Sequence, residues 1–142
     1  CQGFFSKRSF NLFSEFNKNC KEKYSETAGI DIIRYDNNLT LLKSYIENAE
    51  IIVEAIFGTG FSGSLNHSLS ALAQTVNAAK GTVVSIDVPA GADCDSSSVQ
   101  GTVFKADITI AISAYKPIHI MKPCCKYCGR TVVADIGIIK DD

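Results

Sequence analysis

The chain has 142 residues, of which 46% are hydrophobic and 20% are charged, and its 14 basic side chains nearly balance 15 acidic ones. This length suits one domain with a single hydrophobic core. Because the two charges are mixed along the chain, neither a basic face that binds nucleic acid nor an acidic disordered tail is expected. No apolar run approaches the roughly 20 residues that are needed to cross a bilayer. We therefore expect a soluble globular protein that binds no membrane.

The cysteine content indicates a reducing compartment. The six cysteines stand at positions 1, 20, 94, 124, 125 and 128. A secreted disulfide scaffold is usually smaller and more densely cross-linked, so we expect reduced thiols and a cytoplasmic protein, with an organelle as the alternative. The chain begins with Cys1 rather than Met and lacks the pattern of a signal peptide. This start indicates either processing or a fragment whose true beginning lies upstream.

The first fifty residues predict two helices with a strand between them. Aromatic residues and Cys20 recur at helical spacing over residues 9–27, which predicts an amphipathic helix that ends near Gly29. Residues 30–35 follow as a short apolar strand. A second helix is predicted at 39–48, after a turn that is rich in asparagine.

The rest of the chain alternates apolar strands with a helix. Strands are predicted at residues 51–57, 82–88, 108–114 and 131–136, and a helix at 68–79 with Leu69, Leu72, Ala73 and Val76 facing the core. This alternation is typical of a parallel sheet that is covered on both faces. We therefore predict an α/β fold, a three-layer α/β/α sandwich with a Rossmann-like, mostly parallel sheet. Ligands of such sheets bind beyond the carboxyl ends of the strands, where we place the loops 58–64, 89–98 and 115–119.

A glycine-rich loop follows the strand at 51–57. Residues 58–63 fit the pattern G-x-G-x-x-G, and Asp87 lies at the end of the next strand. Such glycines let backbone N–H groups approach a pyrophosphate closely, although a plain turn between strand and helix is the alternative. An NAD-dependent dehydrogenase fits less well, because residues 65–67 separate the motif from the helix and too few strands follow it.

Two acidic residues mark the same edge of the predicted sheet. Glu54 stands inside an apolar strand, and Asp87 ends the next one. A carboxylate in such surroundings is costly unless it is paired, binds a cation or performs acid/base chemistry. Either acid alone could be structural, but two of them beside a glycine loop favour a functional site. Lys116 could pair with a phosphate, pair with one of these acids or lie in solvent, and Asp135 is expected to be structural.

The cysteine cluster at 124–128 does not predict a metal centre. It holds one C-x-x-C pair, whereas a zinc site needs four ligands, commonly from two spaced pairs. A redox role is disfavoured as well. His67 and His119 are expected to be polar loop residues rather than catalysts, and the chain has no G-x-S-x-G nucleophile elbow.

Several motifs, taken in order along the chain, resemble those of a known family. They are residues 52–63 (IVEAIFGTGFSG), 85–91 (SIDVPAG), 105–109 (KADIT), 116–117 (KP), 127–130 (YCGR) and 134–138 (ADIGI). On these residues the chain resembles the YjeF N-terminal domain family of NAD(P)H-hydrate epimerases, strongly over 51–138 and weakly before that. Such a series is far more specific than the glycine pattern alone.

The resemblance implies one YjeF N-terminal-like domain over residues 1–142, with the activity of a metabolite-repair isomerase. The family interconverts the R and S forms of NADHX and NADPHX, the hydrates of NADH and NADPH, in which the nicotinamide ring carries a hydroxyl. A fused or separate dehydratase can then restore the S form. Members bind a potassium ion and are often homodimers, so the resemblance implies both for this chain.

The resemblance also assigns roles by position. The substrate would be held by Gly58, Thr59, Gly60, Phe61, Ser62, Gly63 and Ser64. Asp87 would lie against the nicotinamide ring as a ligand and as the catalytic acid/base. Glu54 would ligate potassium, helped by a group at Ala90.

Three departures from the family pattern support a second hypothesis. The family usually has Asp at the position of Glu54 and Ser at that of Ala90. Its phosphate loop, N-N-G-G-D-G, is absent, and we expect the first strand and this loop to lie upstream of Cys1. These departures favour a non-catalytic nucleotide-binding or dimerisation module, as in the mRNA decapping enhancers, whereas Asp87 and the intact glycine loop favour an epimerase.

Overall fold

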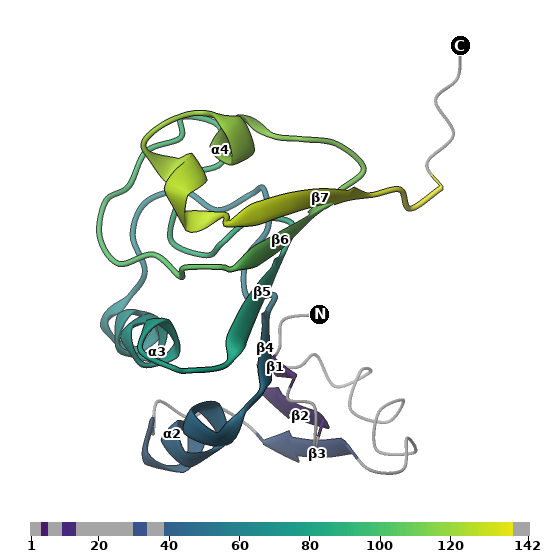
Figure 1. The fold of residues 1–142 in the computed structure, drawn as a ribbon. Coiled ribbons are helices and arrows are strands. Elements are labelled where there is room, and N and C mark those ends of the chain that lie inside the picture. The colour runs from purple at the N-terminus through teal and green to yellow at the C-terminus, as the bar shows by residue number, and fades with distance from the viewer. Residues whose placement is uncertain (1–3, 6–9, 14–29, 34–38, 138–142) are drawn as a thin grey trace.

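The computed structural model describes residues 4–5, 10–13, 30–33 and 39–137, with side chains from residue 39 onward. In this part of the chain the main sheet has the strand order β1-β4-β5-β6-β7 (Figure 1). The strands are β1 (Phe4–Phe5), β4 (Ile51–Glu54), β5 (Thr82–Ile86), β6 (Ile108–Ile112) and β7 (Arg130–Ala134). β4 to β7 are parallel, and β1 pairs antiparallel with β4. The predicted α/β class with a mostly parallel sheet is therefore confirmed.

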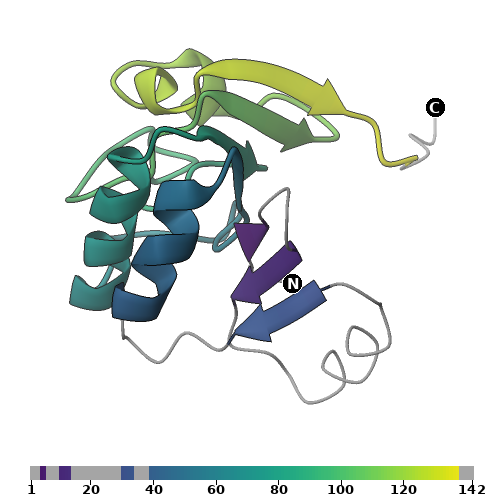
Figure 2. The ribbon, with the colours of Figure 1, turned by 60° about the horizontal axis from the view of Figure 1, so that its bottom comes forward.

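Two long helices cover one face of this sheet. They are α2 (Leu39–Asn48) and α3 (His67–Asn77), which lie side by side in Figure 2. Their buried side chains share one core with β4 and β5, namely Leu42, Ile46, Ile52, Leu72, Ala73, Val76 and Val83. Burial of each large aliphatic side chain contributes about 1.5–3 kcal/mol. Both helices confirm the sequence prediction, while the second helical layer of the sandwich stays a prediction.

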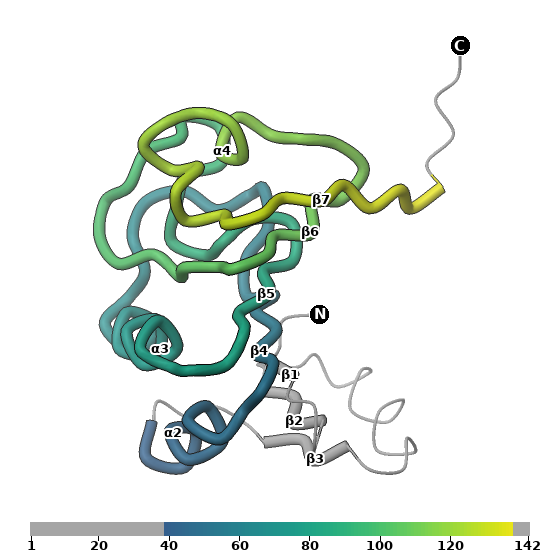
Figure 3. Tube along the Cα trace, viewed as in Figure 1, coloured from purple at the N-terminus to yellow at the C-terminus, as the bar shows by residue number. Residues whose placement is uncertain are grey.

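A second, smaller core lies toward β7. It contains Val88, Ala92, Cys94, Val103, Ile118, Cys124 and Cys128. Two short helices enclose it, α4 (Pro117–Ile120) and the 3-10 helix η1 (Cys124–Tyr127), neither of which the sequence analysis predicted. The chain trace in Figure 3 places α4 at the opposite end of the molecule from α2. None of the helices in the described ranges has the length and apolar character that a membrane crossing requires.

The segment that was predicted as the first helix contains a strand. β2 (Phe10–Phe13) pairs in parallel with β3 (Ile30–Ile33), so the predicted helix over 9–27 is wrong for Phe10–Phe13. Aromatic residues have a strong preference for strands. Helical spacing can arise by chance in a short segment, and here pairing with the apolar strand β3 overrides it. Residues 14–27 lie outside the described part of the chain. β3 confirms the strand that was predicted at 30–35, within the residues described.

The strands of the main sheet end earlier than predicted, at the edge that carries the candidate site. β4 stops at Glu54 instead of residue 57, and β5 stops at Ile86 instead of residue 88. Asp87 has a φ of 70°, a left-handed conformation that no strand can contain. The extended backbone therefore ends at the residues that the sequence analysis singled out.

Candidate functional site

Asp87 and Lys116 form an ion pair at the carboxyl end of the sheet. The Lys116 ammonium donates both to Asp87 Oδ1 and, at 2.6 Å, to the backbone carbonyl of Ile112, where β6 ends. The same Oδ1 accepts the backbone N–H of Ile112 at 3.3 Å. The two charged side chains are only 19% and 16% exposed, so solvent screens their attraction less than at an open surface. Of the three alternatives for Lys116, the structure confirms pairing with an acid.

His119 lies directly behind this ion pair. Its Nδ1 accepts the backbone N–H of Lys116 at 2.9 Å, and its Nε2 lies 2.8 Å from the backbone carbonyl oxygen of Asp87. His119 is 7% exposed, and burial lowers its pKa from the ordinary value, with a smaller lowering from the Lys116 charge. The expectation of a polar loop residue is therefore wrong, since His119 is a buried member of α4.

A signal for His119 was present in the sequence but was not used. Lys116 and Pro117 open a short helix, and His119 occupies its third position. A polar side chain at this position commonly reaches back to the backbone N–H of the residue that precedes the helix. The contact between His119 and Lys116 follows that pattern, whereas the contact with Asp87 joins residues 32 positions apart.

The glycine loop lies against Asp87. A Cβ atom added at Gly58 would stand 3.3 Å from Asp87 Oδ2, so the second carboxylate oxygen faces this loop. The loop turns where the N–H of Phe61 donates to the Gly58 carbonyl at 3.2 Å, and the Phe57 and Phe61 rings stack with centroids 4.6 Å apart. Gly58, Thr59, Gly60, Ser62 and Ser64 are exposed. The structure thus brings the predicted substrate loop and the predicted catalytic acid together.

Glu54 occupies a different environment, inside the main core. Its carboxylate is fully buried and accepts hydrogen bonds from the Ile56 N–H at 2.9 Å, the Ser85 hydroxyl at 2.9 Å and the Ala90 N–H at 3.3 Å. Burial raises the pKa of Glu54 to about 7, although all three hydrogen bonds act to lower it. Glu54 therefore links β4, β5 and the loop after β5. The sequence analysis did not identify Ser85, the partner that register places opposite Glu54.

The remaining candidates are the cysteines, His67 and Asp135. Cys94, Cys124 and Cys128 are buried and carry free thiols, and burial raises the pKa of Cys128 to about 12. Among the described residues, no group of three or more His, Cys, Asp or Glu side chains could hold a metal ion. His67 is exposed, and Asp135 accepts the Gly137 N–H in an exposed turn at 2.9 Å. The structural interpretation of Asp135 is consistent with this turn.

Comparisons with known proteins bear on what this edge of the sheet does. The family described as YjeF-related protein N-terminus matches residues 5–118. The chain belongs to the YjeF-related family. A Leuconostoc kimchii NAD(P)H-hydrate epimerase is 31% identical to this YjeF-related chain over 134 residues, which cover 93% of the chain and 59% of that protein. A Coxiella burnetii bifunctional NAD(P)H-hydrate repair enzyme Nnr is 36% identical over 89 residues, or 63% of the chain and 18% of that protein.

A solved structure supports the same assignment at the level of the fold. The crystal structure of yeast ynu0, YNL200c, superposes on this YjeF-related domain with a TM-score of 0.69 at 18% identity, over 92% of the chain and 56% of that protein. At this identity the likeness shows the fold alone. The chain spans about half the length of the curated relatives it matches.

The potassium ion that the family resemblance implied is not matched by the side chains at its expected site. Ala90 has no side-chain oxygen, and its backbone carbonyl accepts the Phe104 N–H at 3.0 Å. Both carboxylate oxygens of Glu54 already accept hydrogen bonds from protein groups. As placed, Glu54 and Ala90 do not fit a potassium ion, and we derive no chemical step through one.

Proposed function

We propose that this YjeF-related chain is the site-bearing part of an NAD(P)H-hydrate epimerase, an isomerase that interconverts the R and S forms of NADHX and NADPHX. Its curated relatives with this activity in their names support the proposal. The observation that carries it is the position of Gly58 next to Asp87 Oδ2, because this places a charged acid beside backbone that can approach a nucleotide closely.

We propose that the loop of residues 58–64 binds the substrate. Gly58 leaves space directly over Asp87 Oδ2, and the exposed residues Gly58–Gly60 present backbone rather than bulky side chains. Asn66 caps α3 because its Oδ1 accepts the Leu69 N–H, so the loop of residues 58–64 ends before the helix begins at His67. This arrangement suits a dinucleotide held by backbone amides, for which no basic face is needed.

Asp87 is the proposed acid/base. Inversion of a ring carbon that bears a hydroxyl requires the C–O bond to break and to re-form on the opposite face. The hydroxyl takes a proton and leaves as water, and the returning water gives a proton back, so one carboxyl group can serve in both directions. Asp87 Oδ1 is occupied by Lys116 and by the Ile112 N–H, which leaves Oδ2, on the loop side, for the substrate.

We also propose the partners that this activity calls for. A homodimer is proposed on the family resemblance. A dehydratase, fused or separate, is proposed because a bifunctional repair enzyme is among the relatives. A cytoplasmic or organellar compartment accords with the free thiols of Cys94, Cys124, Cys125 and Cys128.

The direct test follows the ratio of S to R forms of chemically prepared NADHX by chromatography. We expect the protein to restore the equilibrium ratio faster than buffer does, starting from a sample enriched in one form. Heat-denatured protein is the matched control. Equal rates with and without native protein would contradict the proposal, and nucleotide binding or dimerisation without acceleration would favour the non-catalytic module instead.

A further inference from the structure

We propose that His119 is a positioning residue for the ion pair of Asp87 and Lys116, acting as a rigid neutral bridge between their two backbones. The catalytic readout of this inference rests on the proposed epimerase function, whereas the bridge itself does not. Nothing in the predicted roles of the chain included His119. The inference follows from where the two ring nitrogens lie.

The first end of the bridge is Asp87. Its φ of 70° is rare for a residue with a side chain, so neighbouring contacts must hold its backbone there. The Asp87 N–H donates to the Ile110 carbonyl at 2.8 Å, and the Asp87 carbonyl meets His119 Nε2 at 2.8 Å. These two contacts fix both peptide groups of Asp87 and thereby the direction in which its carboxylate leaves the chain.

The second end of the bridge is Lys116. Its backbone N–H donates to His119 Nδ1 at 2.9 Å, immediately before α4 begins at Pro117. Proline fixes the backbone that follows, so this hydrogen bond sets the point from which the lysine side chain reaches Asp87. Because an imidazole ring is rigid, its two nitrogens hold the two backbones at one separation. The ion pair is then formed by two side chains whose backbone positions are already fixed.

The contacts determine the chemical state of the ring. A backbone N–H can only donate, so Nδ1 must carry no proton, and a carbonyl can only accept, so Nε2 must carry one. The neutral Nε2–H form is the one form that satisfies both. The charged groups facing the ring are Asp87 and Lys116, and Tyr115 packs edge-on to it with centroids 6.1 Å apart. Since both nitrogens are engaged by backbone, His119 has no free atom with which to exchange a proton with a substrate.

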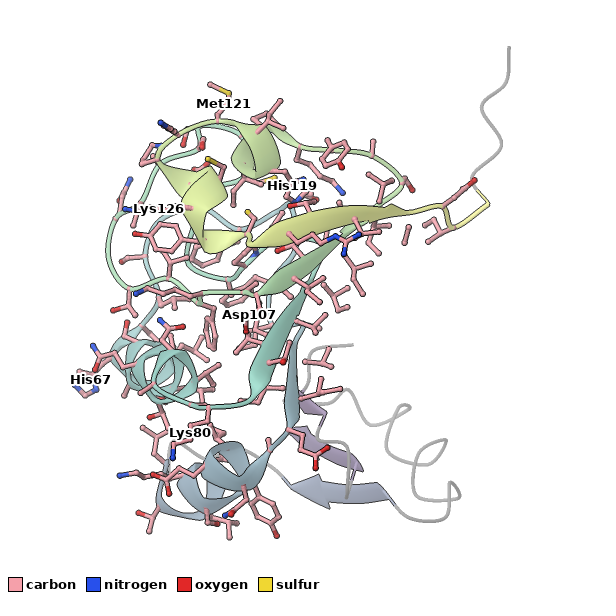
Figure 4. All side chains as sticks on the ribbon, in the orientation of Figure 1. His67, Lys80, Asp107, His119, Met121 and Lys126 are labelled. Carbon is pink, nitrogen blue, oxygen red and sulfur yellow. The ribbon has the colours of Figure 1, made fainter. Side chains whose placement is uncertain are left out.

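Nitrogen NMR tests the bridge without any substitution of His119 itself. The sequence has only two histidines, so the ring signals are assigned by comparison with a His67→Gln variant. Figure 4 shows His67 projecting from α3 and His119 in the region of α4. We expect His119 to show a protonated Nε2 and an unprotonated Nδ1 at pH 7. A His119 that carries its proton on Nδ1, or that carries a proton on both nitrogens at this pH, would overturn the proposal.

Two variants separate the two ends of the bridge in the epimerase assay. His119→Gln can still place an amide N–H near the position of Nε2, whereas His119→Asn can reach only the Lys116 side. We expect His119→Asn to lower kcat by about 10- to 100-fold with KM changed less than threefold, as for residues that orient a catalytic group, and His119→Gln to recover most of the loss. His67→Gln is the matched control and should leave both constants unchanged.

The NMR and kinetic tests distinguish a failure of the His119 proposal from a failure of the epimerase proposal. If the unaltered protein does not accelerate the reaction, the function is wrong while the NMR result still decides the bridge. If kcat of folded His119→Asn equals that of the unaltered protein, the positioning role is overturned. If His119→Asn does not fold, the position of the proton on His119 in the unaltered protein, measured by NMR, decides the proposal.

Discussion

Two carboxylates stand at the ends of adjacent strands, and their surroundings differ in every respect that matters for chemistry. Glu54 is fully buried, and its partners are two backbone N–H groups and a hydroxyl. Asp87 is partly exposed, pairs with the Lys116 ammonium and turns its second oxygen toward the glycine loop. Burial without a cationic partner favours the neutral form of Glu54 and raises its pKa to about 7. Glu54 therefore joins elements of the core, whereas Asp87 directs one carboxylate oxygen at the loop in which we propose that the substrate binds.

The largest expected effect is the loss of epimerisation rate when Asp87 is replaced. Asp87→Asn keeps the size of the side chain and an oxygen that can accept the Ile112 N–H, but it can neither give nor take a proton. We expect the rate of NADHX epimerisation to fall by about 10²- to 10⁴-fold, with a small change in the midpoint of thermal unfolding. Lys105→Asn, at an exposed position on the loop before β6, is a control for surface substitution. Retained activity in Asp87→Asn would remove Asp87 from the mechanism.

The second prediction concerns stability and its dependence on pH. The folded protein raises the pKa of Glu54 from 4.5 to about 7, so the folded state binds the proton more tightly than the unfolded state does. The resulting stabilisation is complete below pH 4.5 and is lost as the pH rises through 7. The loss is at most about 3 kcal/mol, at 1.36 kcal/mol for each pH unit. Urea unfolding of the protein and of Glu54→Gln from pH 4.5 to 8 measures it.

Glu54→Gln is the comparison that isolates this group, because all other titrating groups are common to the two proteins. We expect the difference in unfolding free energy between them to change with pH in the direction given above. A difference that stays constant across this range would show that Glu54 is ionised throughout, as a bound cation would require.

The third prediction tests the contact between the glycine loop and Asp87. Gly58→Ala would place a methyl group 3.3 Å from Asp87 Oδ2, where the substrate is proposed to lie. We expect KM for NADHX to rise several-fold, by about the 1 kcal/mol or more that crowding of a packed site commonly costs. Gly60→Ala is the comparison within the same loop: an added Cβ there meets nothing within 4 Å, so we expect KM to rise less. Equal KM values for the two variants would place the substrate elsewhere.

The smallest expected effect concerns potassium. Because Glu54 and Ala90 do not fit the ion as they are placed, we expect the epimerisation rate to be the same in potassium chloride and in choline chloride at equal ionic strength. A rate that falls in choline and recovers with potassium would show that a cation site forms from other groups, or by rearrangement around Glu54. The rates of Glu54→Gln in potassium chloride and in choline chloride would distinguish these two explanations.

Local pattern was sufficient to predict much of the sheet and part of the site. The apolar runs at β4, β5, β6 and β7 predicted parallel strands because buried strands leave little room for polar residues. The order of strand, glycine loop and acid placed Gly58 and Asp87 at one edge, since carboxyl ends of parallel strands meet there. The helix predicted over residues 9–27 failed at Phe10–Phe13, because pairing with β3 depends on a segment that local spacing does not contain.

The amino-acid sequence by itself determined which chemical groups this protein has at the ends of its strands. Only the tertiary structure decided what each group does there. Lys116 meets Asp87 across 29 positions, and His119 meets the same residue across 32, through a short helix that no periodicity marked. Glu54 has a raised pKa because the fold buries it completely, and its partners Ser85 and Ala90 come from β5 and the loop that follows. The protonation state and partners of a carboxylate depend on distance in space, and the linear order of residues does not encode that distance directly.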